Sequence, residues 1–192
     1  TVSAGQAEKT PASEDEQFVD RGPCLILFGR CWTGGSRIRV EDLSNTSKAA
    51  RVLLIKSCSN DPSYSVINHP LGLMSIAAYL RKQCQCQVKN VDLRLDATDR
   101  SSLESEIRLY APDVVGISAL TFESDALPWI ADAVKRVNAN TPVLLGGPHA
   151  TAYPEQAIQI PGIDYVIVGE GEVASARLIE GIRNRLDPAG LK

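Results

Sequence analysis

Short runs of hydrophobic residues recur along the chain from Arg51 onward, and segments of helix length separate them. The runs are rich in Val, Leu and Ile, and they are apolar at consecutive positions rather than at alternate ones. Strands that are buried on both faces of a parallel sheet have this composition. The five predicted strands are residues 51–56, 88–93, 113–118, 142–146 and 164–169.

Amphipathic or helix-favouring segments follow each predicted strand. The predicted helices are residues 71–83, 100–110, 124–138, 154–160 and 172–185. Five strand–helix units joined by right-handed crossovers predict an α/β domain with a doubly wound, five-stranded parallel sheet, in the flavodoxin-like strand order. Ligands of such sheets bind outside the carboxyl ends of the strands, so the loops after the strands are the candidate binding regions.

The chain divides into four segments by composition. Residues 1–17 are small, polar and acidic, which favours a flexible tail. Residues 18–49 contain two short apolar or alternating runs around Thr33-Gly34-Gly35-Ser36, and these predict an N-terminal extension that forms an accessory hairpin or a loop. The main domain is expected over residues 50–186, and residues 187–192 begin with Asp-Pro, which is typical of a linker before another domain.

Charge and composition exclude several classes of partner. The net charge is -3 and Lys and Arg are spread thinly, so we expect no nucleic-acid partner. The apolar runs are far shorter than the roughly 20 residues of a membrane-spanning helix, so we expect no membrane partner. The five cysteines are irregularly spaced in a chain long enough to fold without disulfides, which favours reduced thiols and a cytoplasmic location.

Three motifs follow the predicted strands in a definite order. His69-Pro70-Leu71-Gly72 follows the first strand, Ser118-Ala119-Leu120 ends the third, and Gly146-Gly147 ends the fourth. There are 45 residues between Gly72 and Ser118 and 25 between Leu120 and Gly146.

In this order the motifs resemble the pattern of cobalamin-binding domains, which is D-x-H-x-x-G, then S-x-L, then G-G. The segments "HPLGLMSIAAYLRK", "APDVVGIS", "VLLGGPHAT" and "DYVIVGEGE" further resemble the cobalamin-binding domain that precedes the catalytic barrel of many radical SAM enzymes. The resemblance covers about residues 50–186 and implies cobalamin as the cofactor.

The resemblance also implies roles for individual residues. Gly146 and Gly147 would lie against the nucleotide tail of the corrinoid, because residues without a Cβ permit close approach to the backbone. Ser118 would reach the benzimidazole end of the tail, and Leu120 would pack beside it. Each feature also has a purely structural interpretation, since Gly-Gly-Pro turns commonly end strands and a serine hydroxyl can bond within its own turn.

His69 matches the pattern only in part, because Ile67 stands where the pattern has an aspartate. A histidine that ligates a metal normally has its second ring nitrogen held by a carboxylate or carbonyl, and isoleucine provides neither. In the radical SAM branch this histidine ligand is commonly missing. Two interpretations therefore stay open for His69: the lower cobalt ligand, or a loop histidine near the corrin ring.

Further candidate residues flank these motifs. In the radical SAM branch Leu71 and Gly72 cap the first helix under the corrin ring. The "GEGE" segment after the fifth strand resembles a family motif near the nucleotide tail, although acidic residues also suit a helix N-terminus. His149 either lines the tail pocket or bonds within its turn. The flanking cofactor-binding candidates are Leu71, Gly72, Pro148, His149, Gly169, Glu170 and Gly171.

The cysteine spacing excludes one cofactor from this chain. Successive cysteines are seven, 27, 26 and two positions apart, so the C-x-x-x-C-x-x-C motif that binds the iron–sulfur cluster of radical SAM enzymes is absent. S-adenosylmethionine and a 4Fe-4S cluster are therefore expected only if a radical SAM domain is attached, either C-terminal to this chain or on a separate one. Such an enzyme would catalyse methyl transfer or a rearrangement.

Two other functions remain open on the sequence. A flavodoxin-like domain without cobalamin would fit the strand order, but no glycine follows the first strand until Gly72, which disfavours a flavin phosphate loop. A domain that serves only as a protein-interaction surface would have its pocket filled by side chains, with Trp32 as a possible anchor. Retention of a corrinoid distinguishes the leading hypothesis from both.

Overall fold

The computed structural model describes residues 18–20, 25–28, 49–59, 68–96 and 99–183. Its central element is a sheet in which five parallel strands follow the order β4-β3-β5-β6-β7. The strands are β3 (Arg51–Lys56), β4 (Gln87–Asp92), β5 (Val114–Ser118), β6 (Val143–Gly146) and β7 (Tyr165–Val168). The predicted five-stranded parallel sheet and its flavodoxin-like order are confirmed, and each strand lies within one residue of its predicted bounds.

Two short antiparallel strands extend this sheet beyond β7. β1 (Phe18–Asp20) pairs with β2 (Leu25–Phe28), and β2 pairs in turn with β7. The turn over residues 33–36, on which the accessory hairpin was predicted, lies outside the described residues, as do residues 1–17 and 187–192. β2 therefore satisfies the backbone groups of β7 that a five-stranded sheet would leave at its edge.

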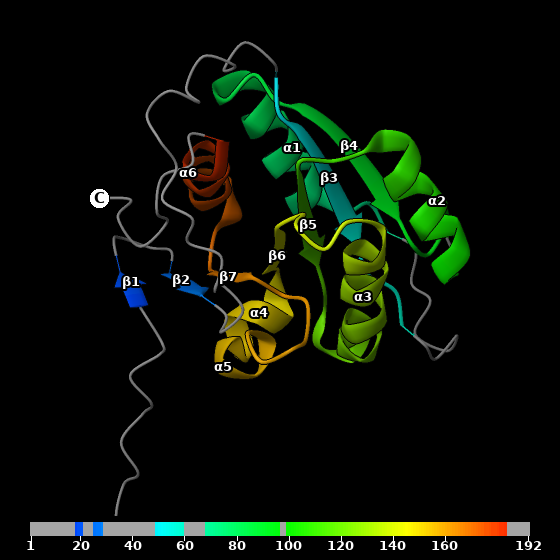
Figure 1. Cartoon of the computed structure of the whole chain (residues 1–192). Helices are drawn as coiled ribbons and strands as arrows, with labels where there is room; N and C mark the ends of the chain where they lie inside the picture. The colour runs from blue at the N-terminus through cyan, green and yellow to red at the C-terminus, as the bar shows by residue number, and fades with distance from the viewer. Residues whose placement is uncertain (1–17, 21–24, 29–48, 60–67, 97–98, 184–192) are drawn as a thin grey trace, which may run out of the picture.

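Helices cover both faces of the sheet (Figure 1). α1 (Leu71–Gln83) and α6 (Gly171–Arg183) pack on one face, and α2 (Arg100–Tyr110) and α3 (Leu127–Val137) pack on the other. The two faces follow from the direction of the crossovers: the chain leaves β3 toward β4 and then returns past β3 to β5, so α1 and α2 fall on opposite sides, and α3 follows α2 because the chain continues in the same direction to β6. The sheet therefore has two separate hydrophobic layers.

The helix predictions held in part. α1 and α2 have the predicted bounds. Asp99 is the N-cap of α2, and its side chain accepts a hydrogen bond from the Ser102 backbone N–H at 2.8 Å. The predicted helix 124–138 divides into the 3₁₀ helix η3 (Thr121–Ala126) and α3.

The connection between β6 and β7 differs most from the prediction. It contains α4 (Pro148–Ala152), which was not predicted, and α5 (Pro154–Ala157), which is shorter than the predicted helix 154–160. Gly-Gly-Pro was interpreted as a turn, but proline is also favoured in the first turn of a helix, where its missing N–H has no partner to lose. The backbone after Gly147 therefore enters a helix at once.

Candidate functional site

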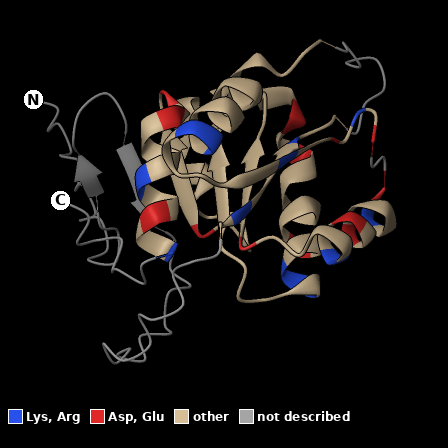
Figure 2. Cartoon of the chain, turned by 90° about the horizontal axis from the view of Figure 1, so that it is seen from above, with Lys and Arg blue, Asp and Glu red and all other residues tan. Residues whose placement is uncertain are grey.

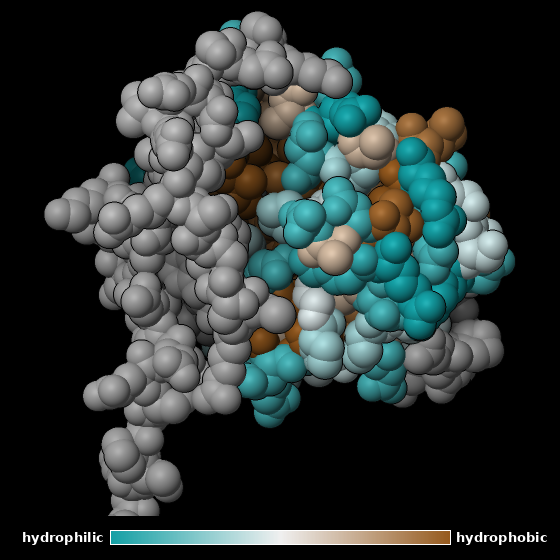
Figure 3. All heavy atoms as spheres, viewed as in Figure 1, coloured by the Kyte–Doolittle hydropathy of each residue, from teal (hydrophilic) through white to brown (hydrophobic). Residues whose placement is uncertain are grey.

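A cavity of about 700 Å³ lies on the face of the sheet that carries α1 and α6. Its volume falls within the usual range for sites that bind small molecules and cofactors. Alternate residues of four parallel strands form its floor: Val52, Leu54 and Lys56 of β3, Val114, Gly116 and Ser118 of β5, Leu144 and Gly146 of β6, and Ile167 of β7. Residues of α1 and α6 form its walls, and the space-filling view shows hydrophobic residues in a hollow between these two helices (Figure 3).

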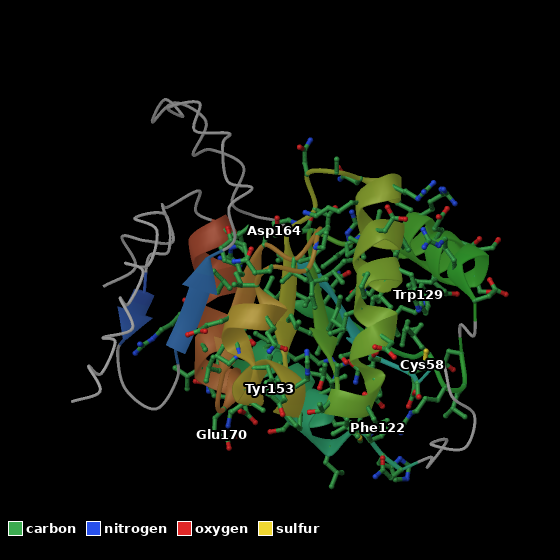
Figure 4. The ribbon with its side chains drawn as sticks, turned by 90° about the horizontal axis from the view of Figure 1, so that it is seen from below. Cys58, Phe122, Trp129, Tyr153, Asp164 and Glu170 are labelled. Atoms are coloured by element: carbon green, nitrogen blue, oxygen red, sulfur yellow. The ribbon has the colours of Figure 1, made fainter. Side chains whose placement is uncertain are left out.

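The cavity opens at the carboxyl edge of the sheet, as the doubly wound fold predicts. Glu170, which follows β7, lines it, as do residues that follow β5 and β6. Figure 4 shows Glu170, Tyr153 and Phe122 along one edge of the domain, whereas Asp164, which precedes β7, lies at the opposite edge. Leu71, Phe122 and Tyr153 are large hydrophobic residues with exposed side chains at this edge.

Small residues in the strands leave the space open. Gly116 lies between Leu54 and Leu144 in the sheet register, and a Cβ at this position would come within 2.8 Å of the Leu54 side chain. One step closer to the carboxyl edge, Ser118 lies between Lys56 and Gly146. β5 therefore adds little side-chain volume to the centre of the floor.

The two consecutive glycines, Gly146 and Gly147, have different structural roles. A Cβ on Gly146 would meet nothing closer than a backbone oxygen at 4.0 Å, so the bare surface of Gly146 faces the cavity. Gly147 has a φ of 90°, and a Cβ there would come within 2.7 Å of the Ser118 hydroxyl oxygen. Gly147 is therefore required by the backbone and by the close packing of Ser118, whereas Gly146 leaves room for a ligand.

Ser118 presents a free hydroxyl at the cavity floor. Among the described residues, no hydrogen bond to its Oγ is found, and its side chain is partly buried. Its backbone oxygen accepts a hydrogen bond from Ser57 at 3.0 Å, which fixes the end of β5. The described residues therefore provide no local hydrogen bond for this hydroxyl, which leaves it available to a ligand.

The loop between β7 and α6 closes one side of the cavity. Gly169 has a φ of 85°, and its N–H donates to the hydroxyl of Thr151 at 3.1 Å. Gly171 lies so close to α1 that a Cβ would approach Ile76 to 2.7 Å. The helices are joined further by a hydrogen bond from the Ser75 hydroxyl to Glu172, at 2.6 Å. The small residues of this loop thus allow α6 to begin directly against α1.

His69 lies outside this cavity. It is exposed and borders a second, smaller cavity of about 310 Å³, which Lys56 and Asn68 also line. Within the described residues no hydrogen bond reaches the imidazole of His69, and Ile67 lies outside them. No group in the described part of the chain therefore fixes the second ring nitrogen of His69 in the way typical of a metal ligand.

The nearby carboxylate of Asp92 is hydrogen-bonded to Arg94 rather than to His69. Arg94 donates to both oxygens of Asp92, at 2.8 and 2.6 Å, and also donates to the backbone oxygen of Asn68 at 2.8 Å. Burial opposes ionisation of Asp92, but its hydrogen bonds with Arg94 outweigh this effect and lower its pKa. Asp92 and Arg94 therefore hold the chain segment that leads to His69, rather than the imidazole itself.

His149 does not line either cavity. It lies in α4, is 6% exposed, and its ring centroid is 5.7 Å from that of Tyr153. Burial lowers the pKa of its imidazole, and its Nδ1 has no hydrogen-bond partner among the described residues. The backbone N–H of His149 donates to the backbone oxygen of Ala119 at 3.1 Å, so α4 packs behind the Ser118–Leu120 loop.

The structure thus brings together ten of the twelve residues predicted to bind the cofactor. The cavity-lining set is Leu71, Gly72, Ser118, Leu120, Gly146, Gly147, Pro148, Gly169, Glu170 and Gly171. Thr151 and Lys56 also line the cavity and were not predicted. Lys56 could have been found from the sequence, because it is a charge directly after the apolar run "VLLI" at the carboxyl end of the predicted strand.

The described part of the chain contains no cluster of three His, Cys, Asp or Glu side chains that could hold a metal ion. Cys84 and Cys86 are buried free thiols, and burial raises the pKa of Cys84 to about 11. Among the described helices none is long and apolar enough to cross a membrane. Figure 2 shows charges of both signs over the helices.

Solved structures with a similar fold include the cobalamin-dependent S-adenosylmethionine radical enzyme OxsB with aqua-cobalamin and S-adenosylmethionine bound. Its TM-score is 0.62 at 16% identity, over 89% of this chain and 27% of that chain. The same enzyme with aqua-cobalamin alone gives a TM-score of 0.61. The fold of this chain is therefore that of a domain present in a cobalamin-dependent enzyme.

Curated relatives also match part of their length. An uncharacterized methyltransferase of Pyrococcus horikoshii is 32% identical over 123 residues, which cover 64% of this chain and 26% of the relative. Cytidylyl-2-hydroxyethylphosphonate methyltransferase of Streptomyces wedmorensis is 28% identical over 153 residues, which cover 67% of this chain and 28% of the relative. The chain thus spans about a quarter of the length of these relatives.

A family model described as the B12 binding domain matches residues 63–179, which include every residue of the two cavities except those of β3. The matched segment is more than half of the chain. This chain belongs to the B12-binding domain family.

Proposed function

We propose that this chain binds cobalamin, with the nucleotide tail in the cavity between the sheet and helices α1 and α6. The observation that carries the proposal is the convergence of ten predicted residues on one cavity. They come from the carboxyl ends of β5 and β6 and from the segments that follow β3, β5, β6 and β7, and the fold brings them together.

The residues of the cavity fit such a ligand. A nucleotide tail is long and partly apolar, and it needs a channel without bulky side chains. Gly146 and Gly72 leave open space where a Cβ would stand, and the strand residues beneath are mainly Val, Leu and Ile. Ser118 offers a free hydroxyl that can donate to or accept from a ring nitrogen at the end of the tail.

His69 is assigned a place beside the corrin ring. It borders the smaller cavity at the carboxyl edge, where the ring of a tail-bound corrinoid would lie. The alternative role, lower cobalt ligand, is tested by substitution. If His69 ligated the cobalt, His69→Ala would shift the visible spectrum of the bound corrinoid, whereas an unchanged spectrum excludes ligation.

We further propose that the chain is the cobalamin-binding module of a radical SAM enzyme of the methyltransferase type. The support is the similarity to a cobalamin-dependent radical enzyme and to two methyltransferases, each about four times longer than the matched segment. Bound cobalamin would supply a cobalt that carries a methyl group or assists a rearrangement. S-adenosylmethionine and a 4Fe-4S cluster would belong to a further domain, because this chain has no C-x-x-x-C-x-x-C motif.

The free thiols of Cys58, Cys84 and Cys86 agree with a reducing compartment, and we propose a cytoplasmic location. A flavodoxin-like domain without cobalamin is not favoured by the family match.

The decisive experiment is corrinoid retention. The purified chain is mixed with hydroxocobalamin and desalted, and its visible spectrum is recorded. We expect corrin absorbance to stay with the protein, and a colourless protein at micromolar concentration would contradict the proposal.

Gly146→Val tests the position of the tail. Its side chain would fill the floor without backbone strain, so the variant should fold normally and bind hydroxocobalamin at least about tenfold more weakly. Ser101→Val is a matched control, because it adds a similar side chain to an exposed position of α2. Equal retention by Gly146→Val and the wild-type chain would mean that the tail lies elsewhere.

A further inference from the structure

Lys56 stands where the two cavities meet. It is the last residue of β3, it is 7% exposed, and it lines both the large cavity and the smaller one beside His69. A lysine is rarely buried to this extent unless it is paired. The position also coincides with the passage from the tail channel to the carboxyl edge, where the ring of a corrinoid would lie.

Two of the three hydrogens of the Lys56 ammonium group have acceptors in the protein. One is donated to the carboxylate of Glu123 and one to the backbone oxygen of Ser57, at 3.0 Å. An ammonium group has three donors. Among the described residues, no third acceptor for Lys56 is found. One buried donor at the junction of the cavities therefore remains for a ligand.

Glu123 fixes the direction of this donor. Its side chain is 2% exposed, and its second carboxylate oxygen accepts a hydrogen bond from the Leu120 backbone at 2.7 Å. The lysine is therefore tied to the same loop that carries Ser118 and Leu120. A donor held in this way loses little conformational entropy when a ligand binds.

The charge of the pair indicates which acceptor it suits. Lys56 and Glu123 together are neutral, so the site offers a strong donor without net positive charge. An anion such as a phosphate diester would gain from Lys56 but would be repelled by Glu123, whereas a neutral carbonyl oxygen meets no such penalty. Corrinoids carry several carboxamide side chains around the ring, and these provide neutral carbonyl oxygens.

A role in stability explains the pair less well. A buried ion pair commonly contributes little to stability, because the loss of hydration offsets the attraction between the charges. Of the ion pairs among the described residues, Lys56–Glu123 is the one in which both side chains are no more than 8% exposed, so this loss of hydration affects it most.

We propose that Lys56 is a ligand-binding residue that donates a hydrogen bond to a carboxamide oxygen on the periphery of the corrin ring. Glu123 is a positioning residue that holds Lys56 in place. This inference rests on the proposed binding of cobalamin and adds a contact to the ring that the S-x-L and G-G motifs do not provide.

The test replaces both charges, because Lys56→Met alone would leave Glu123 buried without a partner. Lys56→Met/Glu123→Gln keeps the shape of both side chains, and the Gln oxygen can still accept from Leu120. Dissociation constants are measured by absorbance titration with hydroxocobalamin and with cobinamide, which keeps the ring carboxamides but lacks the nucleotide. We expect the double variant to bind both ligands roughly 10- to 100-fold more weakly, as for a lost hydrogen bond to a charged group.

Two controls separate this contact from a loss of structure. Glu123→Gln retains the ammonium group but holds it less firmly, so it should weaken binding of both ligands by less than the double variant does. Lys89→Met/Glu106→Gln removes an ion pair of the same residue types that lines neither cavity, so it should leave both affinities unchanged. Thermal unfolding checks that each variant is folded.

The outcomes distinguish the inference from the proposed function. If the wild-type chain retains no hydroxocobalamin, cobalamin binding itself is contradicted. If the wild-type chain binds and the folded double variant binds both ligands equally well, the contact with Lys56 is contradicted. A loss seen with hydroxocobalamin but absent with cobinamide would move the contact to the nucleotide tail and overturn the assignment to the ring.

Discussion

The two faces of the sheet are built from the same strands but serve different purposes. On the face covered by α2 and α3, Val115, Ile117 and Leu145 are buried in a continuous core. On the face covered by α1 and α6, the residues next to these in the same strands include Gly116, Ser118 and Gly146, and a cavity remains. Because neighbouring residues in a strand point to opposite faces, one strand can stabilise the fold on one side and leave space for a ligand on the other.

The largest expected effect is a difference in stability loss between substitutions at two neighbouring residues of β6, one on each face of the sheet. Leu145 is fully buried in the filled face, whereas Leu144 borders the cavity. We expect Leu145→Ala to reduce the free energy of unfolding by about 3–5 kcal/mol and Leu144→Ala by only about 1–2 kcal/mol, because Leu144 already has fewer packing partners. Urea denaturation of both variants measures the difference. Equal losses would mean that the cavity face is as well packed as the other.

The two glycines after β6 should differ in a similar way. We expect Gly147→Ala to cost about 1–3 kcal/mol of stability, because it places a Cβ at a φ of 90° and against the Ser118 hydroxyl. Gly146→Ala should change stability by less than about 1 kcal/mol, since its Cβ enters open space. Thermal unfolding without cobalamin tests this, and a more damaging Gly146→Ala would contradict the assignment of the two roles.

Ser118→Ala should affect the ligand and leave the fold unchanged. Because the hydroxyl has no partner in the described residues, its removal should change the free energy of unfolding by less than about 0.5 kcal/mol. The affinity for hydroxocobalamin should fall about 3- to 10-fold through the loss of one hydrogen bond. Cobinamide serves as the comparison, because a contact with the nucleotide tail predicts an unchanged affinity for it.

The smallest expected effect is on the pH dependence of stability, through His149 in α4. Burial lowers the pKa of His149 in the folded chain below its ordinary value of 6.5. The fold thus favours the neutral imidazole, and the stability that this provides is complete above about pH 6.5 and falls as the pH decreases through the lowered pKa. We expect His149→Gln to lose stability less steeply than the wild-type chain between pH 6.5 and 5, as measured by thermal unfolding. Parallel pH profiles would contradict this.

Much of the fold could be predicted because its signals are local. Runs such as "RVLLIK" and "DVVGIS" contain consecutive apolar residues and alternate with segments of helix length, which is typical of strands in a covered parallel sheet. The start of α2 could also be predicted, since Asp99 is a favourable N-cap. α4 was missed, because Gly-Gly-Pro is compatible with a turn and with a helix start, and the choice depends on packing against Ala119.

The sequence predicted which residues form the candidate site better than it predicted the role of each residue. Ser118 and Gly146 could be named from spacing, but which of the two glycines faces the cavity depends on a backbone angle and on the position of a side chain 29 residues earlier. His149 lies in the same motif as Gly147 yet points away from the cavity, because the helix that begins at Pro148 turns it to the other side.

By itself the sequence determined the parallel sheet, its strand order and the edge of the sheet at which the cavity opens. These follow from the alternation of apolar strands with helices and from the handedness of the crossovers. The tertiary structure alone decided that one face would stay hollow and that Lys56 would meet Glu123 across 67 positions of sequence at the junction of two cavities. Contacts of this kind depend on how strands are aligned and how closely helices approach, and no local pattern encodes them.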